Sequence, residues 1–208
     1  MARPNGVRNH DFAEKRAALL DRLTDHALSA DLRRPSLRQF AIAADTSEPT
    51  LRHYFTNRSG LVVAILQTIG RRGRVIWEAV SAPASCAEEA VGEYLRISEA
   101  GMRHGGFVRA HAFGIIEGVA DPAAGHAYLK HVLEPALEAL RRKLSATDGC
   151  PSDPGSLQAA ALVILSPLLV MSLHQDLLGG REALPIESGA LTAQMETWLG
   201  QALSASSG

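Results

Sequence analysis

Cysteine and aromatic residues are scarce in this chain of 208 residues. Its two cysteines, Cys86 and Cys150, lie far apart and form no C-x-x-C pair, so neither a disulfide framework nor a zinc site is expected. Only 5% of the residues are aromatic, but 46% are hydrophobic, which is enough to build a sizeable core. We therefore expect a globular protein in a reducing cytoplasm.

A secretory signal is also not expected, because the first residues, MARPNGVRNHDF, are polar. One stretch without Asp, Glu, Lys or Arg, residues 154–175, has nearly the length of a membrane span. Gln158, Ser166, Pro167 and Ser172 interrupt it, and acidic rather than basic residues flank it. We expect a helix buried on both sides and no membrane partner.

Charge is distributed unevenly along the chain, although the net charge is only -1. Residues 1–74 contain 13 Lys and Arg against 7 Asp and Glu, whereas residues 75–208 contain 8 against 15. A basic first third favours a polyanionic partner such as nucleic acid, which the acidic remainder would repel. Differences of this size also arise by chance between helices, so charge alone does not identify the partner.

Helix signals recur along the chain, and no strand pattern is convincing. Helix starts are predicted by capping-box spacings and by Asp-Pro pairs, at Asp11 with Glu14, Ser36 with Gln39, Ser85 with Glu88, Asp121-Pro122 and Asp153-Pro154. We expect an all-α protein with about nine helices, at residues 11–30, 36–44, 47–55, 58–81, 85–104, 106–119, 122–146, 154–178 and 188–203.

Two short helices in the basic first third lie close together in the sequence. The apolar residues of the first share one face by their spacing, at Leu37, Phe40, Ala41 and Ala44. After a break at Asp45-Thr46, Ser47 is the expected N-cap of a second helix that buries Leu51 and Phe55. A helix, a tight turn and a helix form the layout of a helix-turn-helix.

The segment SLRQFAIAADTSEPTLRHYFTNRSGLV, residues 36–62, resembles the DNA-binding signature of the TetR (tetracycline repressor) family of transcriptional regulators. The positions that match the signature are Arg38, Ala41, Ala44, Ser47, Thr50, Leu51, Phe55 and Leu61. Tyr54 and Arg58 are common variants of it, whereas Asp45 replaces a turn glycine and Arg52 replaces a tyrosine. The resemblance covers about residues 10 to 65.

The resemblance implies that residues 1–60 form a DNA-binding domain whose second short helix enters the major groove. The DNA-binding candidates are Arg38, Ser47, Glu48, Pro49, Thr50, Arg52, His53, Tyr54 and Arg58. Tyr54 and Arg58 are assigned to phosphates, and Arg3 and Arg8 to an adjacent groove or backbone, unless that arm is only a disordered tail. The alternative interpretation is a polar surface helix with a buried leucine and phenylalanine.

Residues 61–208 are expected to form an effector-binding and dimerisation domain. The helices at 154–178 and 188–203 would pair with their copies in a homodimer, with a kink at Pro167; alternatively, both are simply core. Dimerisation would let two heads read a palindromic operator. The resemblance implies a repressor that an effector releases from its operator by tilting the helix at 58–81, where we expect Gly70 and Gly73 to add compliance.

Effector-binding candidates are the larger or more polar side chains of the middle helices, namely Trp77, Tyr94, Met102, Phe107, His111, Phe113, Met171 and His174. They favour a small, largely apolar effector, although each also fits a role as core filler. No metal is expected, because His126 and His131 are five residues apart and do not share a helix face well. No cofactor is implied.

Competing functions find little support in the sequence. An enzyme is not expected, because no nucleophile-base pair, metal-ligand spacing or phosphate-binding loop is visible. The alternative to a DNA-binding regulator is a helical protein-interaction module, or a small-molecule-binding protein whose helix-turn-helix does not read DNA.

Overall fold

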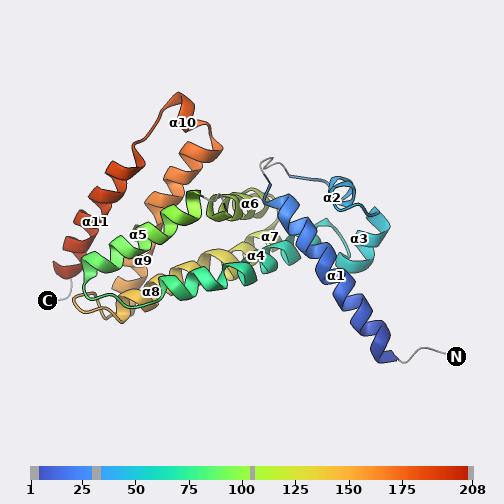
Figure 1. Ribbon diagram of the computed structural model, residues 1–208, viewed down its shortest axis with the longest axis horizontal. Helices are drawn as coiled ribbons and strands as arrows, with labels where there is room; N and C mark the ends of the chain where they lie inside the picture. Colours follow the sequence, from blue (N-terminus) through green and yellow to red (C-terminus); the bar gives the residue numbers. More distant parts are fainter. Residues whose placement is uncertain (1–4, 30–33, 104–105, 206–208) are drawn as a thin grey trace. The chain divides into compact units, whose positions relative to one another are not determined.

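A computed structural model describes residues 5–29, 34–103 and 106–205, with side chains from residue 11 onward except at Arg103 and Phe107. Within these ranges the chain forms α-helices, two short π-helical segments and no strand, which confirms the expected all-α class (Figure 1). The chain divides into two compact units. The first comprises Met1–Arg72 and Phe113–His131, and the second comprises Gly73–Ala112 and Val132–Gly208.

The first unit contains the helices that precede the unit boundary at residue 72 and a later segment that returns to them. Its helices are α1 (Asn5–Ala27), α2 (Leu37–Ala43), α3 (Glu48–Phe55), the first part of α4 (Arg58–Val80), the end of α6 (Gly106–Ala120) and α7 (Pro122–Tyr128). Helix α2 packs against both α1 and α3. Each of these first four helices contributes a fully buried side chain to the unit, namely Leu23, Phe40, Leu51 and Leu61.

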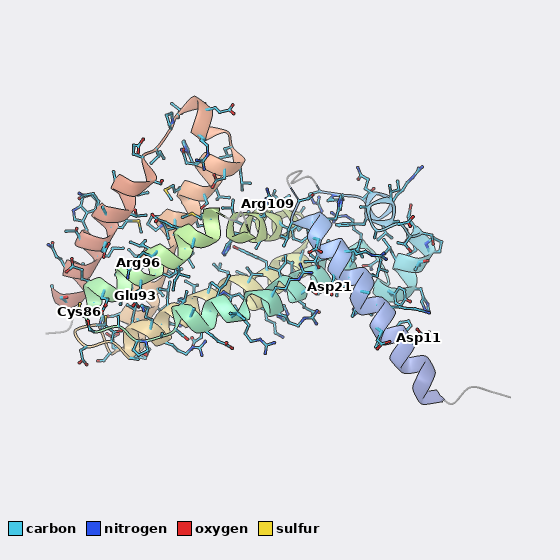
Figure 2. All side chains as sticks on the ribbon, viewed as in Figure 1. Asp11, Asp21, Cys86, Glu93, Arg96 and Arg109 are labelled. Atoms are coloured by element: carbon cyan, nitrogen blue, oxygen red, sulfur yellow. The ribbon has the colours of Figure 1, made fainter. Side chains whose placement is uncertain are left out.

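Charged contacts tie α1 to α4 on the surface of the first unit. Arg72 of α4 donates to Asp21 Oδ1 at 3.0 Å and to Asp25 Oδ1 at 2.6 Å. Figure 2 labels Asp21 on α1. All three side chains are at least 39% exposed, so we expect a small contribution to stability from these pairs.

The second unit is built around α5 (Ala87–Arg103), which packs against α11 (Ser188–Ala205), α8 (Glu134–Ser145) and α9 (Pro154–Ser172). A short α10 (Gly180–Ala183) precedes α11. Lys143 of α8 is fully buried, and its ammonium group donates to Glu93 on α5 and to the carbonyl oxygen of Ala82 at 2.8 Å (Figure 2 labels Glu93). A buried lysine requires such partners.

The helix-start predictions are correct at three positions and wrong at Asp11. The Ser36–Gln39 capping box is present, and Asp121 and Asp153 cap α7 and α9. Helix α1 instead begins at Asn5 and continues through Asp11, whose carboxylate accepts from Lys15 Nζ at 3.0 Å. An i, i+4 ion pair inside a helix thus takes the place of the expected cap.

The capping interaction before α5 is displaced by one residue. Ser85 N–H donates to Glu89 Oε2 at 2.8 Å, so Glu89 rather than Glu88 closes the start of this helix. The pKa of the Glu89 carboxyl is lowered by the Ser85 hydroxyl and the Ser85 N–H, which both donate to it. The helix consequently begins at Ala87 and not at residue 85.

A π-helical segment, η1 (Leu129–Leu133), interrupts the helix expected at 122–146. Pro135 follows it at the start of α8, where proline cannot donate to the carbonyl of His131 and its ring would clash with that carbonyl in an α-helix. The wider turn of η1 relieves this clash. A second π-helical segment, η2 (Leu173–Leu177), follows α9.

Residues Pro154–Leu177 are long and apolar enough to cross a membrane by length and composition, and 44% of their most apolar window is buried in the structure. One face of α9 packs into the core of the second unit, with Ala161, Ile164 and Leu168 at most 1% exposed. A core helix passes the same test, so this segment is weak support for a membrane span. The expected burial on both sides is met on one side only, because Val163 on the other face is 52% exposed.

Candidate nucleic-acid interface

Helix α2 is fixed at its start by reciprocal hydrogen bonds. Ser36 Oγ accepts from the N–H of Gln39 at 3.2 Å, and the N–H of Ser36 donates to Gln39 Oε1 at 2.8 Å. The predicted apolar stripe is buried, with Phe40 at 0% and Ala44 at 2% exposure. Arg38, a DNA-binding candidate, is exposed outside this stripe.

The turn between α2 and α3 depends on a left-handed residue. Asp45 has φ of +49°, the conformation that the missing glycine would supply, and aspartate tolerates it better than most residues. The N–H of Thr46 then donates to the carbonyl of Ala41 at 2.9 Å, which closes the turn. The turn therefore survives the replacement of glycine by Asp45, as expected.

Helix α3 begins at a well-formed cap. Ser47 Oγ accepts from the N–H of Thr50 at 3.2 Å and also lies 2.8 Å from Thr50 Oγ1. Pro49 occupies the first turn, where its missing N–H has no intrahelical acceptor. Ser47 is thus held by its role as a cap, and Thr50 has one side-chain contact already satisfied within the helix.

The outer face of α3 is polar, and its inner face is anchored in the core. Leu51 is 0% and Phe55 4% exposed. The remaining candidates on this helix are half-buried (Glu48, Thr50 and Tyr54) or exposed (Pro49, Arg52 and His53). Arg52 Nη2 lies 3.7 Å from Glu48 Oε2, a solvent-exposed i, i+4 pair that leaves the guanidinium free to exchange partners at little cost.

Helix α1 supports the C-terminal half of α3 through aromatic contacts. The ring of Phe12 lies 4.8 Å from that of Tyr54 and 5.4 Å from that of His53, between ring centroids. Arg16 lies over the Phe55 ring at 4.9 Å, a cation–π distance, and donates to the carbonyl of Tyr54 at 3.4 Å. The sequence analysis did not predict that Phe12 and Arg16 contact α3. Their i, i+4 spacing, which places both on one face of α1, could have indicated a shared contact.

A groove of about 430 Å³ runs beside α3 within the first unit. Thr46, Thr50 and Tyr54 line one side of it, and the basic side chains of Lys15 and Arg22 from α1 line the other. Lys15 and Arg22 are seven residues apart, so they share one face of α1. Neither was among the predicted site residues, although this spacing could have found them.

Arg58 makes internal contacts instead of standing open to solvent. Its guanidinium donates to both carboxylate oxygens of Glu117, at 2.9 and 2.5 Å, and to the carbonyl of Pro35 at 2.7 Å. Glu117 is fully buried, and Arg34 Nε is its second cationic partner at 3.3 Å. The phosphate contact predicted for Arg58 would require it to leave a bidentate pair with a buried carboxylate.

The effector candidates do not come together at one place. Trp77 and Tyr94 line one cavity of the second unit, and Met102 and Met171 line another of about 320 Å³. His111 is buried and belongs to the second unit, whereas the buried Phe113 belongs to the first. His174 lies in η2, where its Nδ1 is 2.7 Å from the Gln175 amide nitrogen.

Several predicted residues lie outside what the structure describes. These are Arg3 and the side chains of Arg8 and Phe107. In the described part of the chain, no group of three or more His, Cys, Asp or Glu side chains is placed to hold a metal ion.

No protein-family model and no curated protein matches the sequence. Among solved structures, the chain is similar to the crystal structure of a TetR-family regulator from Streptomyces coelicolor A3, at 16% identity over 99% of this chain and 97% of that chain. The TM-score is 0.36, which is too low to establish a shared fold. The function is therefore inferred from this chain's own residues.

Proposed function

We propose that the protein is a sequence-specific DNA-binding transcriptional regulator, with α3 as the helix that enters the major groove. The observation that carries the proposal is the capped α2–turn–α3 unit, whose second helix is anchored by Leu51 and Phe55 and leaves a polar outer face exposed. Such a short, rigid helix fits a groove roughly 12 Å wide. The resemblance of residues 36–62 to the TetR DNA-binding signature supports the same function.

Base contacts are assigned to residues around the start of α3. Pro49 offers an apolar ring suited to a thymine methyl, and Thr50 and Arg52 offer hydrogen-bonding groups for base edges. Arg38 on α2, Glu48 and His53 complete the set of candidates for groove contact. Ser47 contributes by fixing the N-terminus of the helix, where free N–H groups favour an anion.

Phosphate contacts are assigned to the basic rim of the groove beside α3. Lys15 and Arg22 line this groove together with Thr50 and Tyr54, so a backbone following it would meet cations from α1. Tyr54 stays a phosphate candidate through its hydroxyl. Arg58, which is paired with Glu117, is assigned a supporting role unless DNA binding displaces that pair.

A homodimer is proposed through α9 and α11. The exposed side chains of α9 form one stripe, at Ala159, Leu162, Val163, Ser166 and Val170. An apolar groove of about 260 Å³ between α9 and α11 adjoins this stripe. Trp198 of α11 is 62% exposed. Contiguous apolar surface of this kind favours a protein partner, and a second copy would supply the matching stripe.

The proposed regulator responds to a small molecule bound in the second unit. Helices α4 and α6 each run from one unit into the other. A ligand that favours one arrangement of these helices would change the separation of the two heads in a dimer and so release a palindromic site. Whether the bound state represses or activates depends on the operator's position.

Selection of genomic fragments by the purified protein, followed by footprinting, tests the proposal. Thr50→Ala and Arg52→Ala should each lose about tenfold or more of the affinity for the recovered site, since a good base contact contributes about 1–3 kcal/mol. Arg142→Ala, an exposed arginine of α8 in the second unit, is the matched control and should bind as the wild type does. The recovered site should be palindromic.

Salt dependence separates the assigned roles. Replacing Lys15 or Arg22 by alanine should weaken binding to all sequences alike and reduce the salt slope by about one each. If no fragment is enriched over non-specific binding at physiological salt, with or without added small molecules, the regulator proposal fails. The helical interaction module then becomes the function to pursue.

A further inference from the structure

A cavity in the second unit contains a polar group without a hydrogen-bond partner. Tyr94 of α5 is 4% exposed, and its hydroxyl is a buried side-chain atom that finds no partner at hydrogen-bonding distance among the described residues. Buried tyrosine hydroxyls usually have a partner, since leaving one unsatisfied costs about 1–3 kcal/mol. The described side chains around Tyr94 therefore leave its hydroxyl group unsatisfied.

The residues around Tyr94 indicate which kind of ligand could form a hydrogen bond with its hydroxyl group. Together with Ser98, one turn along α5, it lines a cavity of about 40 Å³ whose remaining walls include Trp77, Val80, Ile97 and Ala136. Ile76, 51% exposed, also belongs to the lining, so the cavity reaches the surface. The described lining is apolar except for these two hydroxyl groups and the indole N–H of Trp77, and none of it is charged.

The protonation state of Tyr94 limits the chemistry further. Burial raises the pKa of its phenol to about 12, against a smaller opposing effect of the nearby Ser98 hydroxyl, which does not reach hydrogen-bonding geometry. At neutral pH the side chain is thus an uncharged donor and acceptor. An ionised ligand group would lose its hydration here and find no counter-charge in the described lining.

We propose that this cavity is a ligand site for a neutral molecule that inserts one small ring bearing a hydroxyl or carbonyl group toward Tyr94. The inference rests on the proposed function in one respect, because it takes this molecule to be the regulator's effector. Trp77 supplies a flat apolar wall for the ring, and its place on α4 puts the ligand on a helix that continues into the first unit. The volume of about 40 Å³ is smaller than a six-membered ring, so the ring enters only if Trp77 or the half-exposed Ile76 moves aside, as in an induced fit.

The tryptophan content of the chain provides the measurement. Trp77 and Trp198 are its two tryptophans, so a Trp198→Phe protein reports on the cavity through Trp77 fluorescence alone. We would titrate the full chain with phenol, toluene and benzoate, which share a ring and differ in the polar group and the charge. Phenol should change the Trp77 emission with at least about tenfold higher affinity than toluene, the gain from satisfying one buried hydroxyl. Benzoate should give no response.

Variants test the role of the hydroxyl. Tyr94→Phe should fold, because it removes only the unsatisfied group, and should reduce the preference for phenol over toluene to about twofold or less. Ala136→Leu should abolish the response by filling the cavity. Tyr128→Phe, at a buried tyrosine of the first unit, is the matched control and should leave the preference unchanged. A preference that persists in Tyr94→Phe, binding of benzoate equal to that of phenol, or no response to phenol overturns the assignment.

Operator binding distinguishes the two proposals. If phenol binds at the cavity and weakens or strengthens the protein–DNA complex in wild type but not in Ala136→Leu, the cavity is the effector site. If DNA binds specifically but phenol leaves the complex unchanged, the effector role is refuted and the regulator proposal stands. If phenol binds as stated but no DNA fragment is selected, the regulator proposal fails and the effector role fails with it.

Discussion

At the scale of single residues, Glu117 illustrates how one buried carboxylate fixes charged side chains from distant parts of the chain. It is 0% exposed and holds Arg58 and Arg34, which precede it by 59 and 83 residues. Removing one partner of a buried pair leaves the other uncompensated, which is more costly than the pair itself is favourable. Arg58 thereby links the start of α4 to the end of α6.

Glu117→Gln should lower the free energy of unfolding by about 2–3 kcal/mol, because two arginines lose a charged acceptor. Urea denaturation measures this directly. Glu138→Gln is the control, since Glu138 is 49% exposed and its pairs with Arg141 and Arg142 should contribute less than about 1 kcal/mol. Equal decreases in the free energy of unfolding of the two variants would show that burial does not make the Glu117 pairs more important for stability than the exposed pairs of Glu138.

His111 should make the protein sensitive to mild acid. Burial lowers the pKa of this imidazole to about 4, against about 6.5 in an unfolded chain. Between pH 6.5 and 4 the unfolded state therefore binds a proton at His111 that the folded state does not bind. The contribution of neutral His111 to the free energy of unfolding is complete above pH 6.5 and is lost as the pH falls toward 4. The loss should approach about 3 kcal/mol.

Stability curves of wild type and His111→Leu across this range test the expectation. The variant should decline less than the wild type between pH 6.5 and 4.5, and a smaller decline should remain in both proteins, because burial and the neighbouring Lys130 also lower the pKa of His131. Asp121 and Asp153 do not interfere, because hydrogen bonds from Ser59 and Ser156, respectively, and from backbone N–H groups hold their pKa below the usual range and move their effects to lower pH. A variant that declines as the wild type does would exclude His111 as the cause.

At the scale of elements, α3 depends on its cap more than a longer helix would, because it is only 8 residues long. Ser47→Ala should destabilise the first unit by about 1 kcal/mol, whereas Ser47→Gly should cost only a few tenths, since glycine is tolerated at this position. Thermal or urea unfolding measures both. An alanine variant as stable as the wild type would mean that the Ser47 hydroxyl contributes nothing.

The close approach of α6 and α7 requires two glycines. A Cβ at Gly118 would lie 2.9 Å from the Cα of Gly125, and one at Gly125 would lie 3.1 Å from the carbonyl oxygen of Gly118. Backbone stands on both sides of this contact, so a side chain can enter only if the helices separate. This contact also places Glu117, the neighbour of Gly118, on a helix with little freedom to shift.

The local elements were predictable because their signals lie within a few residues of each other. The caps at Ser36 and Ser47 and the left-handed Asp45 each follow from neighbouring residues and were confirmed. The contact of Phe12 with Tyr54 and the pair of Arg58 with Glu117 join residues at least 42 positions apart. Single-sequence spacing holds no information on such pairs, and the amphipathic periodicity of α1 does not reveal which of its residues meet α3.

Some misses have a local cause that competing signals concealed. Asp11 and Glu14 have the spacing of a capping box, but Asp11 and Lys15 equally have the spacing of a helical ion pair, and the second is what the structure contains. Pro135 could have indicated the break at η1, since proline excludes a regular α-helix through its preceding turn. The predicted DNA and effector contacts remain predictions, because they concern molecules outside the chain.

At the scale of the whole molecule, we expect the exposed stripe of α9 to govern the oligomeric state. Val163→Glu should convert the proposed dimer to a monomer, because a carboxylate buried opposite its own copy would be unpaired. Sedimentation velocity at micromolar concentration measures the change, and the folding stability should barely alter since Val163 is 52% exposed. Val119→Glu, at a side chain 88% exposed on α6, is the control.

A monomer should also lose operator affinity, because a single short helix reads too few base pairs to be specific. If Val163→Glu stays dimeric while Trp198→Glu on α11 dissociates, the interface is carried by α11 alone. If neither variant alters the sedimentation of the protein, the exposed face of α9 serves another partner.

The first compact unit is not continuous in sequence, since it recruits Phe113–His131 from the middle of the chain. Grafting the proposed DNA-binding head onto another protein by cutting near residue 60 or 72 would leave Arg58 without Glu117 and Gly70 without the backbone of His131 beside it. A working chimera would have to import the returning segment as well, as a second splice. The unit that can be transferred is therefore defined by contacts in space and not by one continuous stretch of sequence. Recombination at a single crossover point would divide it.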